Sequence, residues 1–318
     1  MSRRQLTFWR SRVLIAGVAV FSFSCSNIVG GSKPLPFHAT DYRIASLRYQ
    51  ERPYVGEKIV PLDYRNSYPT DDEGIILFIY KDQGYYHPVN ISQWALRFLD
   101  SYVQTDDPEY LQLAEIFAEK LLDLSIAVKD ALYLPYDFDI PVHGHPVDKM
   151  IAPWYSGMAQ GQSLSVFARL YDLTGERKYL TSAEKIFRSF FYLREGNNPW
   201  TVYVDSSGYY WIEEYPMEVP GQVLNGFIFA IYGLYDYHLL FHDTMSRQLL
   251  QGATTTIHHY ISAYRNKGDI SKYCLKHGHQ NGGYHMVHID QLDMLYRITG
   301  DRYLKDMADS LYADYHTK

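Results

Sequence analysis

The sequence contains little cysteine, with only Cys25 and Cys274 among 318 residues. If Cys25 carries a lipid, as argued below, Cys274 has no second cysteine to pair with. The stability of the mature domain must then come from packing rather than from disulfide bonds. The chain also lacks an excess of basic residues, because its formal net charge is -6. The composition thus gives no argument for binding to nucleic acid or to anionic lipid, for which a broad basic surface is typical.

The apolar run near the start of the chain is also short. It covers residues 13–23, which is too few for an ordinary membrane-spanning helix, and it follows four arginines. This pattern predicts a signal peptide over residues 1–25, with Cys25 as the lipidation site of a bacterial lipoprotein. A plain secretory signal with an incidental cysteine is the alternative. We expect a tether over residues 26–43 and an exported protein of the bacterial cell envelope, held at the membrane only by this lipid.

Tyrosine, by contrast, is abundant: the chain has 31 tyrosines, and aromatic residues make up 16% of it. A tyrosine side chain offers a flat apolar ring together with a hydroxyl, which suits a sugar-binding groove. A tyrosine-rich helical core is the alternative interpretation. The hydrophobic content of 47% and the charged content of 21% are ordinary for a soluble globular protein.

Residues 44–86 have the character of strands and turns. The run at residues 75–80 is rich in β-forming residues, and it is bracketed by Asp71, Asp72, Gly74 and Gly84 at expected turns. We therefore expect a short β-hairpin segment over residues 44–86, leaning on the main domain.

From Pro88 onward the sequence has helical periodicity and a weak internal repeat. Four copies are anchored by Tyr102, Tyr171, Tyr235 and Tyr296, at spacings of 69, 64 and 61 residues. In each copy, one helix ends near Thr-Gly or its equivalent, where glycine takes the positive φ of a C-cap. An acidic residue then begins the next helix and complements its dipole.

A single helical hairpin of this kind cannot bury its apolar face alone, so four of them must stack. The sequence thus predicts an all-α fold, an (α/α) toroid of about four helical hairpins over residues 87–318. We expect its inner helices at residues 88–102, 154–171, 220–235 and 285–296.

Polar and aromatic residues gather around the starts of these inner helices. They lie at residues 84–93, 153–162, 211–227 and 273–291. Loops that lead into the inner helices share one end of a toroid, so four such clusters indicate one shared site. Each residue taken alone could instead cap or support a helix.

Four motifs resemble the C-terminal domain of D-glucuronyl C5-epimerases: Trp154-Tyr-Ser-Gly-Met-Ala-Gln-Gly-Gln162, Glu213-Glu-Tyr-Pro216, Leu224-Asn-Gly-Phe227 and Gly233-Leu-Tyr-Asp236. Residues 273–277 and 284–292 are similar to two further segments of that family, and residues 84–93 to a segment that precedes the domain. The order of all segments is kept from about residue 85 to the C-terminus. Two departures stand out: Lys276 replaces an arginine of the family, and the large β domain of the animal members is missing.

The resemblance implies inversion of C5, from D-glucuronic to L-iduronic acid, in a heparosan- or glycosaminoglycan-like polysaccharide. Such a reaction needs proton carriers on both faces of the ring and donors that stabilise a developing enolate. The resemblance implies that Glu214, Tyr215, Tyr273 and Tyr284 are the catalytic positions. We expect Glu214 and Tyr284 to carry protons on opposite faces, with Tyr215 and Tyr273 as relays or donors. No cofactor is expected, and a homodimer is left open.

The remaining candidates are binding residues, chosen from their placement in the sequence. Candidates for binding the uronate carboxylate are Lys276, Asn225 and His288, and candidates for the sugar subsites are Tyr155, Gln160 and Tyr86.

We assign no metal from the sequence. The pairs His285/His288 and His143/His145 have spacings that can present two ligands, but neither has a third and a fourth ligand at zinc-like spacing. Histidine on a helix is more often a hydrogen-bonding residue.

Three other functions are alternatives to the epimerase. A uronate polysaccharide lyase begins with the same removal of the C5 proton and then eliminates the C4 substituent. A lipid-anchored carbohydrate-binding protein without activity is a second alternative. A glycoside hydrolase is a third, since toroids host many of them, although the sequence places no carboxylate pair.

Overall fold

The computed structural model describes residues 36–316, except residues 57 and 146. The expected signal peptide, the lipidation site Cys25 and residues 26–35 of the expected tether lie outside the described residues. Among the described helices, none has both the length and the apolar character needed to cross a bilayer.

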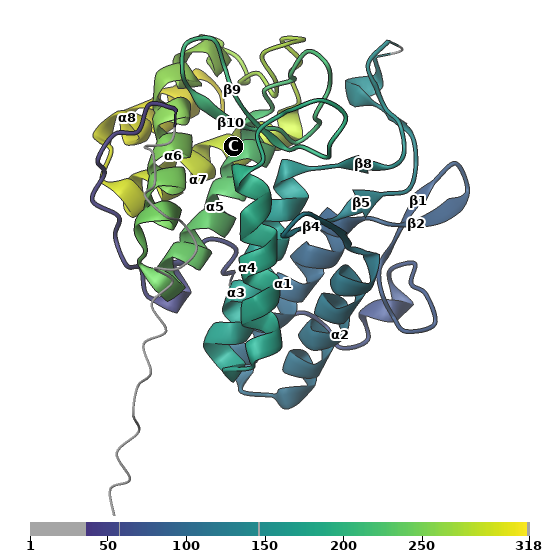
Figure 1. Ribbon diagram of the computed structural model, residues 1–318. Coiled ribbons are helices and arrows are strands. Elements are labelled where there is room, and N and C mark those ends of the chain that lie inside the picture. The colour runs from purple at the N-terminus through teal and green to yellow at the C-terminus, as the bar shows by residue number, and fades with distance from the viewer. Residues whose placement is uncertain (1–35, 57, 146, 317–318) are drawn as a thin grey trace, which may run out of the picture. The chain divides into compact units, whose positions relative to one another are not determined.

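Eight α-helices form four hairpins in the described part of the chain (Figure 1). Their bounds are α1 Pro88–Thr105, α2 Pro108–Leu124, α3 Gly157–Thr174, α4 Arg177–Arg188, α5 Leu224–Phe241, α6 Thr244–Tyr264, α7 Gly282–Thr299 and α8 Arg302–Asp314. Each odd-numbered helix packs on the helix that follows it, and α1, α3, α5 and α7 pack on one another in that order. The odd-numbered helices are thus the inner layer and the even-numbered ones the outer layer of an (α/α) toroid, as the repeat predicts.

The turns inside the hairpins have the predicted chemistry. Gly175 and Gly300 end α3 and α7 with φ angles of 70° and 73°. In the other two copies, Asp106 and His242 adopt the same left-handed backbone without being glycine. A side chain at such a position is uncommon but tolerated, above all for Asp, Asn and His, so the repeat can lose its glycines and keep its turn. Three outer helices begin at aspartate caps: Asp107, Asp243 and Asp301.

Two inner helices begin later than the sequence predicts. Gly157 is the first residue of α3, because the two residues before its Ser156 cap form a strand. In the third hairpin, the Glu213 carboxylate accepts hydrogen bonds from the backbone N–H groups of Gly221 and Gln222 at 3.0 and 3.1 Å. These bonds hold that segment as a loop, so α5 begins only at Leu224.

Ten short strands form five antiparallel pairs in the described residues. The pairs are β1 (Leu77–Tyr80) with β2 (Gln83–Tyr86), β3 (Ile126–Val128) with β4 (Ala131–Tyr133), β5 (Pro135–Tyr136) with β8 (Trp154–Tyr155), β6 (Ile140–Pro141) with β7 (Lys149–Met150), and β9 (Val202–Val204) with β10 (Tyr210–Ile212). The first pair is the predicted N-terminal hairpin, although Ile75 and Ile76 precede the strand and are buried. The strands labelled in Figure 1 gather toward the upper end of the helices.

The core is tightest where α3 crosses α5. A Cβ atom on Gly233 would lie 2.1 Å from the carbonyl oxygen of Gly161, and one on Gly161 would lie 2.3 Å from the Cα of Ala230. Real Cβ atoms do not approach other atoms this closely, so this crossing needs glycine on both helices.

A buried ion pair joins the same two helices. Arg169 of α3 donates from Nε to Asp236 of α5 at 2.9 Å, and both side chains are 1% exposed. The guanidinium also donates to the carbonyl oxygen of Pro53 at 2.6 Å, which attaches the N-terminal segment to the toroid.

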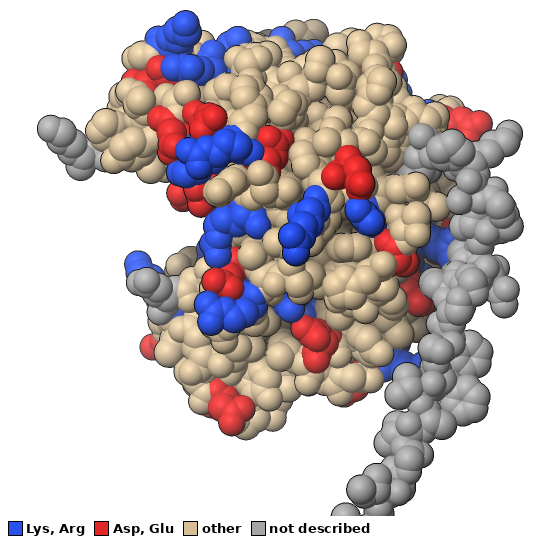
Figure 2. Space-filling view, turned by 90° about the vertical axis from the view of Figure 1, so that its left-hand side faces the viewer, with Lys and Arg blue, Asp and Glu red and all other residues tan. Residues whose placement is uncertain are grey.

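Charge on the surface is mixed. On the face shown in Figure 2, lysine and arginine side chains are interspersed with aspartate and glutamate. That face has no broad patch of one sign, in keeping with the small net charge of the chain.

Candidate active site

A pocket of about 240 Å³ opens where the inner helices begin. Residues from all four predicted clusters contribute, together with the β5 and β6 strands that follow α2. The lining residues are His87, Val89, Asn90, Gln93, Tyr136, Ile140, Trp154, Ser156, Met158, Glu214, Tyr215 and Tyr284. Side chains from four separate hairpins therefore converge on one cavity, as the clusters before the inner helices indicate.

Two consecutive glutamates follow β10 and serve different purposes. Glu213 is buried, holds the loop before α5 through its hydrogen bonds to Gly221 and Gln222, and does not line the pocket. Glu214 lines the pocket and is 7% exposed. Space for its carboxylate depends on Gly226 in the first turn of α5, where a Cβ atom would lie 2.2 Å from Glu214 Oε2.

The Glu214 carboxyl is set up to exchange a proton near neutral pH. Burial raises its pKa to about 7, although the hydroxyls of Tyr215 and Tyr273 lower it in part. The Tyr273 hydroxyl lies 3.3 Å from each of the two carboxylate oxygens and donates to them. A general base works best when its pKa lies near the operating pH, so this carboxyl meets that requirement.

Three tyrosines surround this carboxyl. Burial and the neighbouring Glu214 carboxylate raise the pKa values of Tyr215 and Tyr273 well above 10, and that of Tyr284 more modestly. The rings of Tyr273 and Tyr284 meet edge to face, with centroids 4.8 Å apart. At neutral pH these hydroxyls are protonated and can donate, so the centre combines one ionisable carboxyl with three donors.

The structure brings together the four residues named as catalytic, but it places the predicted carboxylate binders in different surroundings. The Lys276 ammonium pairs with Asp148 at 2.7 Å and does not line the pocket. Asn225 is buried beside the Tyr273 hydroxyl and lowers its pKa, but its amide is not aligned for a regular hydrogen bond. His288 is buried, bonds through Nδ1 to Ser271 Oγ at 2.7 Å, and lies next to the Tyr273 ring.

The three predicted subsite residues lie outside the set that lines the pocket. Tyr155 packs on Tyr133 at 5.5 Å, because neighbouring residues of a strand point to opposite faces and Trp154 takes the pocket side. Gln160 is fully buried, and its side-chain amide forms hydrogen bonds with the backbone of Leu132 and Leu134, which join α3 to that segment. The Tyr86 hydroxyl donates to Asp71 at 2.7 Å.

Several residues that line the pocket were not predicted from the sequence as site residues. Tyr136 and Trp154 stack with centroids 3.8 Å apart and give the pocket an aromatic wall. His87 caps α1 through Nδ1, and burial lowers its pKa to about 4, so it is neutral at physiological pH. His87 and Trp154 belong to clusters that the sequence marks, whereas nothing local marks Tyr136.

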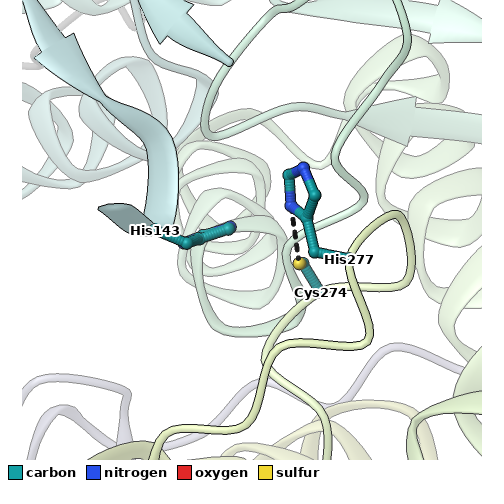
Figure 3. A group of neighbouring side chains, drawn as sticks. All are labelled: His143, Cys274 and His277. Atoms are coloured by element: carbon teal, nitrogen blue, oxygen red, sulfur yellow. Dashed lines mark hydrogen bonds between the residues drawn. The ribbon is translucent and has the colours of Figure 1, made fainter. Parts of the chain in front are cut away.

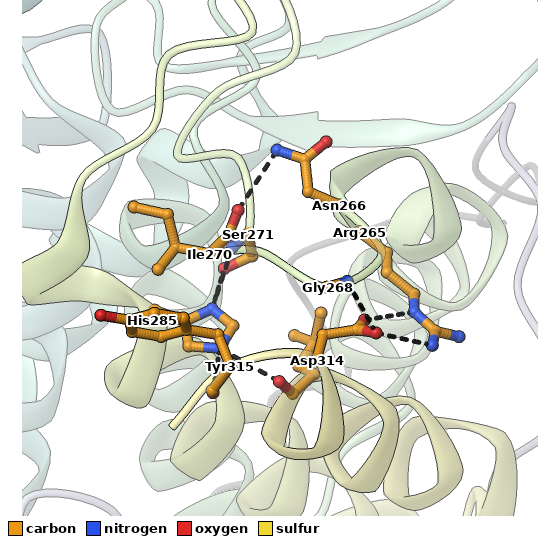
Figure 4. Close-up of polar contacts among 9 residues, drawn as sticks. Arg265, Asn266, Gly268, Ile270, Ser271, His285, Asp314 and Tyr315 are labelled. Carbon is orange, nitrogen blue, oxygen red and sulfur yellow. Dashed lines mark hydrogen bonds and ion pairs between the residues drawn. The ribbon is translucent and has the colours of Figure 1, made fainter. Parts of the chain in front are cut away.

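His285 has a structural role in the last hairpin. Its Nδ1 accepts from the Ser271 backbone N–H at 2.9 Å, and its Nε2 donates to the carbonyl oxygens of Leu311 and Tyr315 (Figure 4). Both ring nitrogens are therefore occupied, and His285 joins the loop before α7 to the end of α8. An ion pair of 2.6 Å between Arg265 and Asp314 also joins the end of α6 to the end of α8 (Figure 4).

The fold is that of sugar epimerases among the solved structures. A sugar epimerase from a ruminal bacterium aligns with a TM-score of 0.55 at 14% identity, over 79% of this chain and 66% of that one. Cellobiose 2-epimerase from Spirochaeta thermophila aligns with a TM-score of 0.55 at 12% identity, over 79% and 64% of the two chains. At such identity the likeness concerns the fold. The chain is an (α/α) toroid.

Sequence comparison identifies the family. Residues 129–312 match the D-glucuronyl C5-epimerase C-terminus family, which is more than half of the chain. The chain belongs to this family. It is 29% identical over 182 residues to a D-glucuronyl C5-epimerase of Caenorhabditis elegans, a match that covers 51% of this chain and 29% of the worm protein. Membership of this family supports an epimerase-like function on carbohydrate.

A second relative matches over nearly its whole length. It is an uncharacterized protein of Methanocaldococcus jannaschii, 24% identical over 310 residues, with 92% of this chain and 95% of that protein covered.

Proposed function

We propose that the chain is a uronate C5-epimerase. It would remove the C5 proton from D-glucuronic acid residues of an acidic polysaccharide and return a proton to the opposite face, giving L-iduronic acid. The family and the worm relative support this class of reaction. The observation that carries the proposal is Glu214, a buried carboxyl with a pKa of about 7 in a pocket lined by tyrosines.

The chemistry requires help for the uronate carboxylate. Removing a proton from the carbon next to an ionised carboxylate puts further negative charge on that group, so donors or cations must face it. The hydroxyls of Tyr215 and Tyr273 are protonated near neutral pH and are the proposed donors. Lys276 would have to leave Asp148 to take part.

Inversion further requires a second proton carrier across the sugar ring. Glu214 and Tyr284 both line the pocket, and they come from the loop after β10 and from α7. We assign these two residues to opposite faces of the ring. In one turnover Glu214 takes up the C5 proton and the Tyr284 hydroxyl donates its proton to C5. The two residues return to their starting states when Glu214 releases a proton to solvent and the Tyr284 phenolate takes one up from solvent, so no cofactor is needed.

The size of the pocket fits one uronate ring. Its volume of about 240 Å³ lies below the ~300–1,000 Å³ of pockets for drug-sized ligands. Neighbouring sugars of the polymer would lie outside this cavity, and the aromatic wall of Tyr136 and Trp154 offers flat apolar area for the ring that enters.

Incubation with heparosan in heavy water tests the proposal. The expected result is deuterium at C5 together with iduronic acid, seen by NMR, and an unchanged chain length. Unsaturated ends that absorb ultraviolet light would identify a lyase instead. If neither appears on heparosan or on other glucuronans while the polymer binds, the non-catalytic carbohydrate-binding alternative stands.

The proposed place of action is the bacterial cell envelope, on the basis of residues 1–25. Fractionation of cells that produce the wild type and Cys25→Ser tests this location. The wild type should sediment with membranes and the variant should not. Equal distribution of the two proteins would rule out the lipid anchor.

A further inference from the structure

A cluster of metal-type ligands lies beside Tyr215 and Tyr273, two of the tyrosines around Glu214. His143, Cys274 and His277 each offer one ligand atom, and these atoms lie within 4.8 Å of one another. Figure 3 shows His143 pointing toward the Cys274–His277 pair from a different loop. His143 lies between β6 and β7, whereas the other two lie between α6 and α7.

His143 has a free ligand atom. Its Nε2 is buried and has no hydrogen-bond partner in the described structure. Its backbone is in the left-handed region at φ 53°, which is uncommon but tolerated for histidine. A ring nitrogen that is buried without a partner indicates that something outside the described protein atoms completes its contacts.

His277 is oriented by a carboxylate. Its Nε2 lies 2.5 Å from Asp148, which leaves Nδ1 facing the Cys274 sulfur at 3.5 Å. A carboxylate on the outer nitrogen is the usual support of a metal-binding histidine, because it fixes the tautomer and the ring orientation. The inner nitrogen then presents its lone pair toward the cluster.

The distances suit a tetrahedral ion. With zinc–sulfur and zinc–nitrogen bonds of about 2.3 and 2.05 Å, two ligands of a tetrahedral site lie about 3.6 Å apart. The sulfur of Cys274 and Nδ1 of His277 already have this separation. The ligand nitrogen of His143 lies within 4.8 Å of the other two ligand atoms, so a ring movement of about 1 Å would complete the set.

We propose that His143, Cys274 and His277 bind a zinc-type divalent cation, with Asp148 supporting His277 from outside. Three protein ligands leave a fourth position for water or for another ligand, as in open zinc sites. Nitrogen and thiolate donors select zinc over magnesium or calcium.

The ion would lie close to two of the tyrosines that surround Glu214. The His143 ring is 5.0 Å from the Tyr273 ring and 5.8 Å from the Tyr215 ring, measured between centroids. A nearby cation stabilises a phenolate, so the ion would lower the pKa of the Tyr273 hydroxyl. The zinc proposal rests on the cluster alone and stands or falls independently of the C5 reaction.

The test is metal binding by the full chain after treatment with a chelator. Titration with Zn²⁺ in a calorimeter should give one ion per chain. Co²⁺ should produce the strong near-ultraviolet absorption of a thiolate ligand. Cys274→Ser should abolish that absorption and weaken binding at least tenfold, and His143→Ala should also weaken it. Asp148→Asn, which keeps all three ligands, should weaken binding by about 10- to 100-fold.

His259→Ala is the control, because His259 is exposed on α6 and lies outside the cluster. It should bind Zn²⁺ like the wild type. Circular dichroism shows whether each variant is folded. The proposal is overturned if the folded wild type binds no stoichiometric Zn²⁺, or if binding survives in folded Asp148→Asn and Cys274→Ser unchanged.

Discussion

The Tyr273 hydroxyl lies at the same distance, 3.3 Å, from both oxygens of the Glu214 carboxylate. It is one of two hydroxyls that lower the pKa of this carboxyl against the effect of burial. Burial, Tyr215 and Tyr273 therefore together determine how readily Glu214 takes up and releases a proton. Because the hydroxyl bridges both oxygens, it also limits rotation of the carboxylate within the pocket.

Glu214→Gln tests the base directly. The amide keeps the shape of the side chain and cannot accept a proton, so deuterium exchange at C5 should fall by about 10²- to 10⁴-fold. NMR in heavy water measures the exchange. Glu218→Gln, at an exposed position of the same loop, is the control and should keep the wild-type rate. Full activity of Glu214→Gln would contradict the assignment.

The pH dependence of exchange follows from the same carboxyl. As a base, Glu214 must be ionised, so the rate should rise with pH and level off above about 7. The raised pKa values of the tyrosines predict no decline at mildly alkaline pH. Initial rates from pH 5 to 9 provide the profile. A rate that is flat across pH 7 would exclude Glu214 as the titrating base.

The free energy of unfolding should fall as the pH rises, whereas the exchange rate rises. The pKa of Glu214 is raised from 4.5 to about 7 on folding, so the folded state holds a proton that the unfolded state releases in this range. The contribution is complete below pH 4.5 and is lost as the pH rises to 7. At pH 8, the free energy of unfolding of Glu214→Gln should therefore exceed that of the wild type by up to about 3 kcal/mol. Urea unfolding at pH 5 and 8 measures the difference.

Tyr273→Phe should shift the pH profile. Loss of the donor removes one of the interactions that lower the pKa of Glu214, so the midpoint should move to higher pH by about one unit. A purely structural role would lower the rate without moving the midpoint. Tyr264→Phe is a matched control, since the Tyr264 hydroxyl donates to Gln222 and makes no contact with Glu214.

Tyr284→Phe separates exchange from inversion. If Glu214 and Tyr284 act on opposite faces, the variant can still remove and return a proton at one face. It should incorporate deuterium into only one of the two C5 epimers, with inversion reduced by at least about 10²-fold. NMR of D-glucuronic and L-iduronic oligomers, tested separately, shows which epimer incorporates deuterium. Normal inversion by Tyr284→Phe would remove this residue from the mechanism.

Asp236→Ala tests the ion pair that joins α3 to α5. It leaves the Arg169 guanidinium buried without its carboxylate, so unfolding should require about 3–5 kcal/mol less free energy. Asp306→Ala is the control: it breaks an exposed pair with Arg302 on α8 and should cost less than about 1 kcal/mol. Urea denaturation of both variants measures the contrast.

The repeat made the toroid predictable, because its turn chemistry is local. Gly175 and Gly300, with the acidic residues after them, fix two of the four turns, and the spacing of the tyrosines locates the other two. The start of α5 was predicted too early, because it depends on Glu213 bonding to a loop that follows it. No local pattern reveals a contact of that kind.

The site was predictable only in part for the same reason. The clusters before the inner helices predicted where the site lies, and the family resemblance named Glu214 and Tyr284, which do line the pocket. Tyr136 was missed because it lies on a short strand among ordinary aromatic residues. The His143–Cys274–His277 cluster was not predicted because its ligands come from two loops that are far apart in the chain, so no local spacing reveals them.

The crossing of Gly161 and Gly233 bears on how a substrate can be accommodated. Backbone atoms limit the approach of α3 to α5 there, so no change of side-chain rotamer can bring these helices closer or let them slide. The ends of the two helices that carry Ser156 and Asn225 should keep a constant separation during turnover. Any induced fit must then occur in the connecting loops, and polymers of different width would be selected by loop length rather than by helix packing.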